Sequence, residues 1–214
     1  MTAALQIPNQ PIYPLPKPVT VEQFIEWYPD ISEYRYELRD GVIYQMPQPR
    51  GKHSQVGGAA AKRLVYAIDA AKFTYFIPRE CLVKVKGDTA YEPDAVVLDE
   101  SVLTEEPLWE RASTVQYGKT IKLSIEVVST NWQDDYEVKL AAYESLGIPE
   151  YWILDYAGLG GIRHIGRPKQ PTLTICTLID GEYEVVRLRD EAPITSMTFP
   201  DLNLTARDLL GRGE

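Results

Sequence analysis

The sequence predicts an α/β or α+β domain in which a mixed β-sheet is flanked by helices. Helix-like and strand-like hydrophobic periods alternate along the 214 residues. A hydrophobic content of 44% is ample for one core of this size. The chain shows neither an internal repeat nor a heptad run. We expect a proline-rich arm over residues 1–19 and a single domain over residues 20–214.

The first elements follow from local signals in the N-terminal third. A short helix begins at Thr20, with Gln23 as its capping-box partner. Two alternating runs then form strands joined by Asp40-Gly41, a strong hairpin signal. A long helix starts near His53, and small residues let it approach the sheet. These residues are Gly57, Gly58, Ala59 and Ala60.

The rest of the chain alternates strands with helices. An acidic excursion over residues 99–119 precedes the apolar strand IKLSIEVV, and a helix over residues 134–146 ends at Gly147. Asp180-Gly181 marks a second hairpin, and LTARDLL forms a last short helix. The other predicted strands are FTYFIP, CLVKVK, PDAVVLD, EYWILD, IRHIG, TLTICTLI and EYEVVRLR.

Composition excludes several classes of protein. No apolar run approaches the roughly 18 residues of a membrane span, and the N-terminus lacks a signal-peptide pattern, which predicts a cytoplasmic protein. Cys81 and Cys176 stand apart in strand-like runs and read as buried thiols. Two histidines and no cysteine pair disfavour structural zinc. No glycine-rich nucleotide-cofactor motif is present.

The net charge of −9 argues against strong sequence-independent binding of nucleic acid, because such affinity comes mostly from contacts of Lys and Arg with phosphates. Much of the excess is local. Residues 88–110 contain eight acids and neither Lys nor Arg. An acidic metal site would itself add negative charge, so a nuclease is still compatible with this balance.

Three charged residues lie in segments that otherwise read as buried. Asp94 begins the apolar run after Pro93, Glu126 lies inside IKLSIEVV, and Lys139 shares the core-facing side of its predicted helix with aromatic residues. Each alone reads as a solvated charge or a lysine whose head reaches water. Together they favour a metal-dependent phosphodiesterase, because buried charges need partners.

Pro93-Asp94 followed by Glu126-Val127-Val128 resembles the PD-(D/E)XK nuclease superfamily. The strings YELRDGVIYQMPQPRGKH and EVVSTNWQDDYEVKLAAYESLGIPEYWILD are similar to the bacterial Uma-type endonuclease family, over roughly residues 20–190. The resemblance implies a restriction-endonuclease-like fold. One departure is that Val128 stands where the superfamily has lysine. Lys139 matches the lysine that this narrower family carries on the following helix.

The resemblance implies Mg²⁺ or Mn²⁺ held by Asp94, Glu126 and the backbone carbonyl of Val127. Lys139 would then orient the attacking water or stabilise charge on the phosphate. Glu37 matches a glutamate in the first hairpin of the family and could bind the metal through water or place a second ion, although a surface hairpin charge is an equal alternative. His53, with Arg50 and Lys52, would contact substrate, although a turn or capping histidine explains it as well. Glu92 is a spare ligand candidate, and Lys84 and Lys86 are candidate backbone contacts.

The leading hypothesis is therefore a Mg²⁺-dependent DNA endonuclease, for which a homodimer is one arrangement. RNA or another phosphoester is an open alternative substrate, since the same chemistry serves each. The second hypothesis is a nuclease fold with weak or no catalysis that binds nucleic acid or protein. The net charge, the acidic stretch and Val128 favour this second reading.

Overall fold

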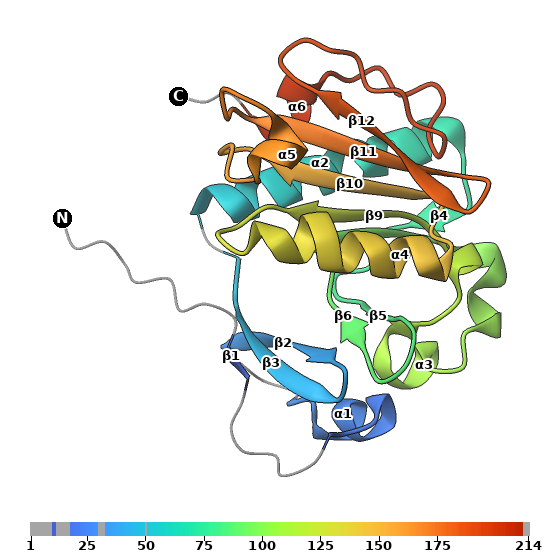
Figure 1. Cartoon of the computed structure of the whole chain (residues 1–214). Coiled ribbons are helices and arrows are strands. Elements are labelled where there is room, and N and C mark those ends of the chain that lie inside the picture. Colours follow the sequence, from blue (N-terminus) through green and yellow to red (C-terminus); the bar gives the residue numbers. More distant parts are fainter. Residues whose placement is uncertain (1–9, 12–17, 30–32, 50, 212–214) are drawn as a thin grey trace.

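The computed structural model describes residues 10–11, 18–29, 33–49 and 51–211. Its strands form two six-stranded sheets, each containing parallel and antiparallel pairs, with helices packed against them (Figure 1). The predicted class of mixed β-structure flanked by helices is confirmed, with the strands divided between two sheets. Of the predicted N-terminal arm, the structure describes Gln10–Pro11 and residues 18–19.

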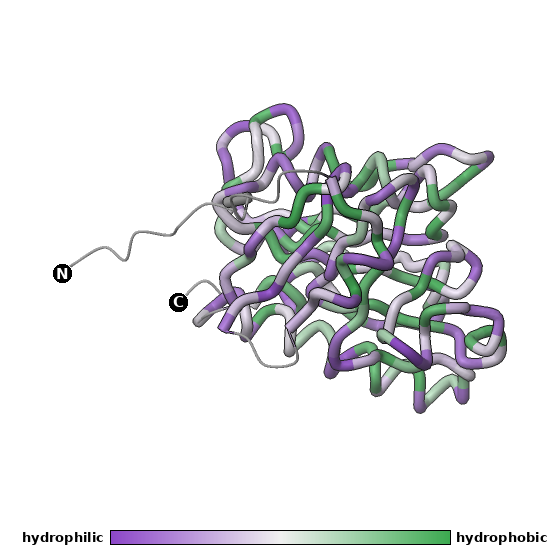
Figure 2. Tube along the Cα trace, turned by 90° about the horizontal axis from the view of Figure 1, so that it is seen from below, coloured by the Kyte–Doolittle hydropathy of each residue, from purple (hydrophilic) through white to green (hydrophobic). Residues whose placement is uncertain are grey.

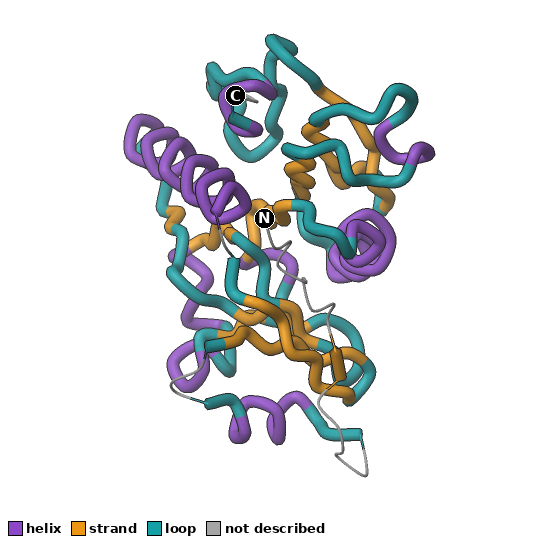
Figure 3. The backbone as a smooth tube through the Cα atoms, turned by 90° about the vertical axis from the view of Figure 1, so that its left-hand side faces the viewer, coloured by secondary structure: helices purple, strands orange, loops and turns teal. Residues whose placement is uncertain are grey.

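The upper sheet of Figure 1 has the order β12-β11-β10-β9-β7-β4. Helix α2 (Gly51–Ala71) and helix α4 (Leu140–Leu146) lie on opposite faces of this sheet (Figure 1 and Figure 3). The sheet has one parallel pair, β9 with β10, and its other pairs are antiparallel. Its strands are β4 Tyr75–Phe76, β7 Ala95–Asp99, β9 Ile121–Val127, β10 Glu150–Asp155, β11 Thr172–Ile179 and β12 Glu182–Leu188.

The lower sheet has the order β1-β3-β2-β6-β5-β8 and carries helix α1 (Val21–Trp27). Phe24 of this helix packs with Leu38 and Ile43 in a small separate core. The predicted hairpin is present, with φ of +48° at Asp40 and +77° at Gly41. The strands are β1 Gln10–Pro11, β2 Tyr34–Arg39, β3 Val42–Pro47, β5 Leu82–Lys84, β6 Ala90–Tyr91 and β8 Thr114–Val115.

Strand alternation divides the main core into two layers. One face of the upper sheet carries Val97, Leu123 and Ile125 against α2 (Gly51–Ala71), whereas Val96 and Leu98 face the other layer with Tyr143. Hydrophobic residues accordingly concentrate along the strands, and hydrophilic ones in the peripheral loops (Figure 2). A charged residue on an inner strand must therefore find its partners within a layer.

A register shift between Val97 and Leu98 changes the face of the sheet on which Ile121 lies. Leu98 pairs with Ile121, one residue out of the register that joins Val97 to Leu123. The β-bulge turns Ile121 into the layer opposite Leu123, although simple alternation predicts that they share a face. The predicted small-residue face of α2 is only partly used. Ala60 is fully buried, and a Cβ on Gly57 would meet Val127, whereas a Cβ on Gly58 would meet nothing.

The predicted helix over residues 134–146 consists of two parts. A π-helix, η3 (Asp134–Lys139), leads directly into α4 (Leu140–Leu146), which ends at Gly147 with φ of +81° as predicted. Capping boxes begin α1 at Thr20 and α6 (Ala206–Leu210) at Thr205. The acidic excursion folds as η1 Glu100–Glu105, α3 Trp109–Ala112, β8 and η2 Gly118–Thr120.

The strand predicted at IRHIG is wrong. Residues Ile162–Ile165 form one turn of helix, α5. The carbonyl of Gly161 accepts hydrogen bonds from the N–H groups of His164 and Ile165, so the backbone is satisfied within the turn. The apolar spacing that suggests a strand instead places Ile165 in the core. No helix in the described part of the chain is both long enough and apolar enough to cross a membrane.

The two cysteines provide a test of this packing. Both are buried and unpaired, and burial raises the pKa of the Cys176 thiol to about 12 and that of Cys81 further. Thiolate is the reactive form, so we expect neither to react with Ellman's reagent at about pH 8 in the native protein, and both to react in guanidinium. Absorbance of the released thiolate measures this. Rapid reaction of a thiol in the native state would contradict the core described here.

Candidate functional site

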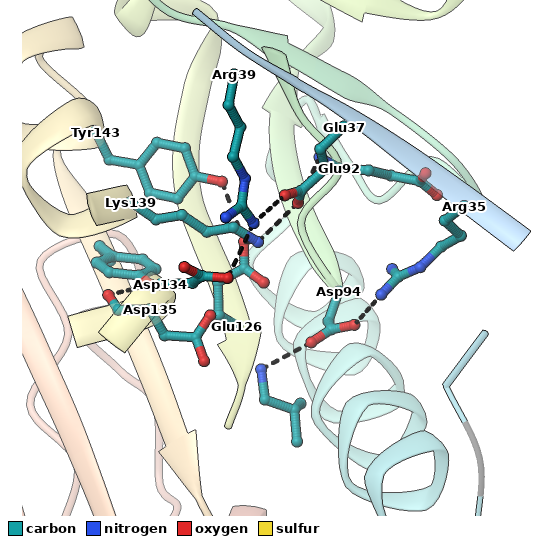
Figure 4. Close-up of polar contacts among 12 residues, drawn as sticks. Arg35, Glu37, Arg39, Glu92, Asp94, Glu126, Asp134, Asp135, Lys139 and Tyr143 are labelled. Carbon is teal, nitrogen blue, oxygen red and sulfur yellow. Dashed lines mark hydrogen bonds and ion pairs between the residues drawn. The ribbon is translucent and has the colours of Figure 1, made fainter. Parts of the chain in front are cut away.

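The candidate site lies where the two sheets meet (Figure 4). Strand β2 of the lower sheet supplies Glu37, and Asp94 lies just before β7 of the upper sheet. Glu126 comes from β9, and Lys139 is the last residue of the π-helix. The four residues predicted as catalytic therefore come from β2, from β9, from the π-helix and from the segment just before β7.

Lys139 is the centre of this cluster. Its Nζ lies 2.9 Å from Oε1 of Glu37 and 2.9 Å from Oε1 of Glu126. Only 4% of Lys139 is exposed, against 1% of Glu37 and 3% of Glu126. The hydroxyl of Tyr143 donates a second hydrogen bond to Oε1 of Glu126, at 3.1 Å. One buried ammonium therefore joins a carboxylate of each sheet.

The π-helix explains why a lysine on a helix can reach this position. Its wider turn keeps Asp135, Tyr136 and Lys139 all buried, whereas Glu137 and Val138 point outward. π-Turns inside α-helices are frequently found at functional sites. The sequence predicts the burial of Lys139 from ordinary helical spacing, but it gives no sign of the π-turn.

Asp94 and Glu126 are neighbours across two antiparallel strands. Ala95 pairs with Ile125, so extending this register by one residue sets Asp94 opposite Glu126. The N–H of Val127 donates to Oδ2 of Asp94 at 2.8 Å, which fixes the carboxylate beside β9. Directly opposite residues have Cβ atoms about 4.5–5.5 Å apart. The structure therefore brings the two predicted metal ligands together.

Two arginines also contact the acidic residues of the cluster. Nη2 of Arg35 lies 3.3 Å from Oδ1 of Asp94. Nη2 of Arg39 lies 2.8 Å from Oε2 of Glu37 and 3.0 Å from Oδ2 of Asp134. Sequence reasoning missed both arginines, although Arg35, Glu37 and Arg39 alternate along β2 and so share one face. That alternation was the available signal.

Asp135 is a further residue that sequence reasoning missed. It is buried, and its side chain points toward the carboxylate of Glu126 (Figure 4). Its backbone carbonyl accepts a hydrogen bond from Tyr151. The available signal was its spacing of four residues from Lys139, which places both on one side of a helical turn.

Burial and neighbouring charges change the acidity of the cluster. Burial raises the pKa of Glu126 to about 7, with Lys139 opposing and Asp94 adding to the rise. Burial raises the pKa of Asp135 well above its usual range, although Lys139 lowers it, and Glu126 and Asp94 add to the rise. Burial alone would also raise the pKa of Glu37, but Lys139 and Arg39 hold it below its usual value. Burial acts to lower the pKa of Lys139, yet Glu126 and Glu37 raise it, so the ammonium stays charged.

The other predicted residues lie at varying distances from the cluster. Nε2 of His53, in the first turn of α2, is 3.4 Å from Oδ2 of Asp94. Lys52 is exposed, and Arg50 lies outside the described residues. Glu92 accepts a hydrogen bond from the hydroxyl of Tyr28, and its N–H donates to Glu37. Lys84, in β5 of the lower sheet, pairs with Glu22. Lys86 follows this strand and is exposed.

The donor set suits a hard divalent cation. Asp94 and Glu126 supply carboxylate oxygens, and Oε2 of Glu126 has no hydrogen-bond partner within the described ranges. The same ranges contain no group of three or more His, Cys, Asp or Glu side chains that could hold a metal by themselves. Mg²⁺ commonly binds through one or two carboxylates and keeps several waters, so two carboxylates and a carbonyl fit it.

Comparison with known proteins identifies a family and a common fold. A family model described as "Uma2: Putative restriction endonuclease" matches residues 21–207. No curated protein matches the chain. A solved structure titled as a putative nuclease of the DUF820 family, from Anabaena variabilis, matches with a TM-score of 0.65 at 18% identity. The match covers 90% of this chain and 98% of that one, and it shows a common fold.

Replacing Lys139 tests the electrostatic centre. Lys139→Met leaves Glu37 and Glu126 buried without their common cation, so we expect the free energy of unfolding at about pH 8 to fall by about 3–5 kcal/mol. Lys122→Met is the control, since Lys122 pairs with Asp99 at 3.1 Å in a more exposed place and should cost about 1 kcal/mol or less. Urea denaturation measures both. Equal losses would show that Lys139 is an ordinary surface cation.

Asp135 gives a pH-dependent prediction. Its raised pKa means that the folded protein holds this proton more tightly than the unfolded chain, so the carboxylate destabilises the fold as pH rises. We therefore expect Asp135→Asn to raise the free energy of unfolding at about pH 8, by about 1 kcal/mol or more, and by less at about pH 5. Urea denaturation at both pH values measures the difference. A gain that is larger at the lower pH would contradict the assigned direction.

Proposed function

The chain belongs to the Uma2 family of restriction-endonuclease-like proteins, and we propose that it is a metal-dependent endonuclease that hydrolyses phosphodiester bonds of DNA. The observation that carries the proposal is the pairing of half-buried Asp94 with buried Glu126, whose carboxylate lies beside the ammonium of Lys139. Burying this many charges is costly for a purely structural role. The arrangement is useful to an enzyme that must hold a cation and a phosphate together.

Asp94, Glu126 and the carbonyl of Val127 would hold Mg²⁺ or Mn²⁺. When bound, such an ion polarises the phosphate and lowers the pKa of a coordinated water. The protein's own part is to hold both carboxylates side by side. The N–H of Val127 holds Asp94 in place, and Lys139 favours the charged form of Glu126.

Lys139 acts as a fixed positive charge. Its pKa is raised by Glu126 and Glu37 against the effect of burial, so it cannot serve as a general base near neutral pH. An ammonium in this place donates hydrogen bonds and offsets negative charge that develops on the phosphoryl oxygens. Of the two roles expected for this lysine, charge stabilisation and orientation of water both use the protonated form.

Glu37 positions Lys139. It is ionised and buried, and its two oxygens are held by Lys139 and Arg39. These contacts support a role in aiming the ammonium at Glu126 rather than a role as a metal ligand. His53 lies beside Asp94 at the start of α2, and this position supports a contact of its side chain with a substrate phosphate.

A cleavage assay tests the proposal. We expect purified protein to cut supercoiled plasmid or single-stranded DNA in Mg²⁺ or Mn²⁺ at low salt, and not in EDTA. Asp94→Asn and Glu126→Gln should each reduce the rate by about a hundredfold or more, since each removes a ligand charge. Gel analysis of the products measures the rate, and circular dichroism checks that each variant is folded.

Glu110→Gln is the matched control, because it removes an exposed acid of α3 that lies outside the cluster. It should cut as fast as wild type. If Asp94→Asn also cuts at the wild-type rate, the site is misassigned. A folded wild-type protein that cuts neither DNA nor RNA under any metal condition would instead favour a nuclease fold that only binds nucleic acid or protein.

A further inference from the structure

A polar pocket opens on one side of Asp94. Its volume is about 390 Å³, within the range of roughly 300–1,000 Å³ that is usual for ligand sites. Arg35, Asp94 and Glu92 line its inner part, and Arg79 and Tyr34 lie toward the outside. The pocket therefore connects the candidate metal ligand Asp94 to solvent, past two arginine side chains.

Asp94 already has protein donors on both of its oxygens. Oδ2 accepts from the N–H of Val127 at 2.8 Å and lies 3.4 Å from Nε2 of His53. Oδ1 is 3.3 Å from Nη2 of Arg35. The contact of Oδ2 with Val127 is part of the strand framework, whereas the contact of Oδ1 is with a side chain. A cation that uses Oδ1 must therefore compete with Arg35.

Arg35 is half-buried, and its contact with Asp94 is long for a charged pair, which is usually about 2.7–2.9 Å. The Nε atom of Arg35 is buried and has no hydrogen-bond partner among the residues that the structure describes. A guanidinium has several N–H donors and is suited to bidentate binding of phosphate. Arg35 therefore has unused donor capacity at the wall of the pocket.

The charges around Arg35 depend on the state of the cluster. Burial acts to lower the pKa of Arg35, while Asp94, Glu92, Glu126 and Glu37 all raise it, so four carboxylates attract the guanidinium. A divalent cation on Asp94 and Glu126 would offset two of these charges and leave those of Glu92 and Glu37. The same cation that competes for Oδ1 would therefore weaken the attraction of Arg35 to its present place.

We propose that Arg35 holds the Asp94 carboxylate in the metal-free protein, releases it when a divalent cation binds, and then binds a phosphate of the nucleic acid in the adjoining pocket. This inference rests on the proposed function and adds a phosphate-binding residue to it. Arg35 would serve as counter-ion in one state and as substrate contact in the other. The site would then grip nucleic acid fully only when it is loaded with metal.

Metal affinity without any nucleic acid is the first test. Mn²⁺ is titrated by calorimetry into wild type, Arg35→Gln and Asp94→Asn. Removal of the competing cation should tighten Mn²⁺ binding by about fivefold or more in Arg35→Gln. The Asp94→Asn variant identifies which part of the heat belongs to this site.

Arg79→Gln is the matched control. Arg79 lines the same pocket and carries the same charge, but it is exposed and pairs with Glu80 instead of Asp94. Its loss should change Mn²⁺ affinity by less than about twofold, because exposed charges are screened. Equal tightening in both variants would reflect net charge alone and would overturn the exchange.

Binding of nucleic acid is the second test. A fluorescent single-stranded oligonucleotide with phosphorothioate linkages is titrated in Ca²⁺ and in EDTA, and its anisotropy is followed. Arg35→Gln should weaken binding about fivefold in Ca²⁺ and by less than about twofold in EDTA, where Arg35 is engaged with Asp94. An equal loss under both conditions would mean that Arg35 does not change partner.

The outcomes separate this inference from the proposed function. If wild type cuts DNA and Asp94→Asn does not, while Arg35→Gln binds Mn²⁺ no tighter than wild type, only the exchange is wrong. If wild type neither cuts nor binds Mn²⁺ through Asp94, and Arg35→Gln does not bind it either, both are wrong. Should Arg35→Gln fail to fold, Arg35→Lys, which keeps the charge but loses the planar fork, must bind the oligonucleotide more weakly than wild type in Ca²⁺ for the inference to stand.

Discussion

The buried contact of Lys139 with Glu37 and Glu126 is the interaction on which the rest of the site depends. Glu37 belongs to the lower sheet and Glu126 to the upper sheet, so one ammonium links the two halves of the fold at 2.9 Å on each side. Burial disfavours the charged form of both carboxylates, and this cation opposes that effect at each of them. Two further charged residues extend this contact. Arg39 pairs with the second oxygen of Glu37, and Asp134 in turn pairs with Arg39.

In this arrangement the negative charges of the candidate metal ligands repel one another. Asp94, Glu126 and Asp135 share one small volume, and burial together with mutual repulsion raises the pKa of Glu126 and Asp135. In the metal-free protein the positive charges of Arg35 and Lys139 oppose this repulsion. A cation bound there, as proposed, would relieve the same repulsion more directly.

Sequence patterns predicted the elements well where the signals are local. The Asp40-Gly41 hairpin, the Thr20 cap, the Gly147 helix end and the burial of Lys139 all follow from short-range rules. The division into two sheets, the bulge beside Ile121 and the helical turn at 162–165 depend on long-range packing, which no local pattern reports. The site shows the same limit. Its residues Asp94, Glu126, Lys139, Glu37 and His53 were identified partly by resemblance, whereas Arg35, Arg39 and Asp135 required the fold.

The placement of the site across the two sheets also has a consequence for synthesis of the protein. Glu37 and Asp94 leave the ribosome well before Glu126 and Lys139, and the charged contacts close only when residues from 35 to 143 are all in place. A nascent chain that ends before the π-helix contains Glu37, Asp94 and Glu126 but lacks the ammonium that joins Glu37 to Glu126. Until the π-helix has been synthesised, the site is therefore incomplete.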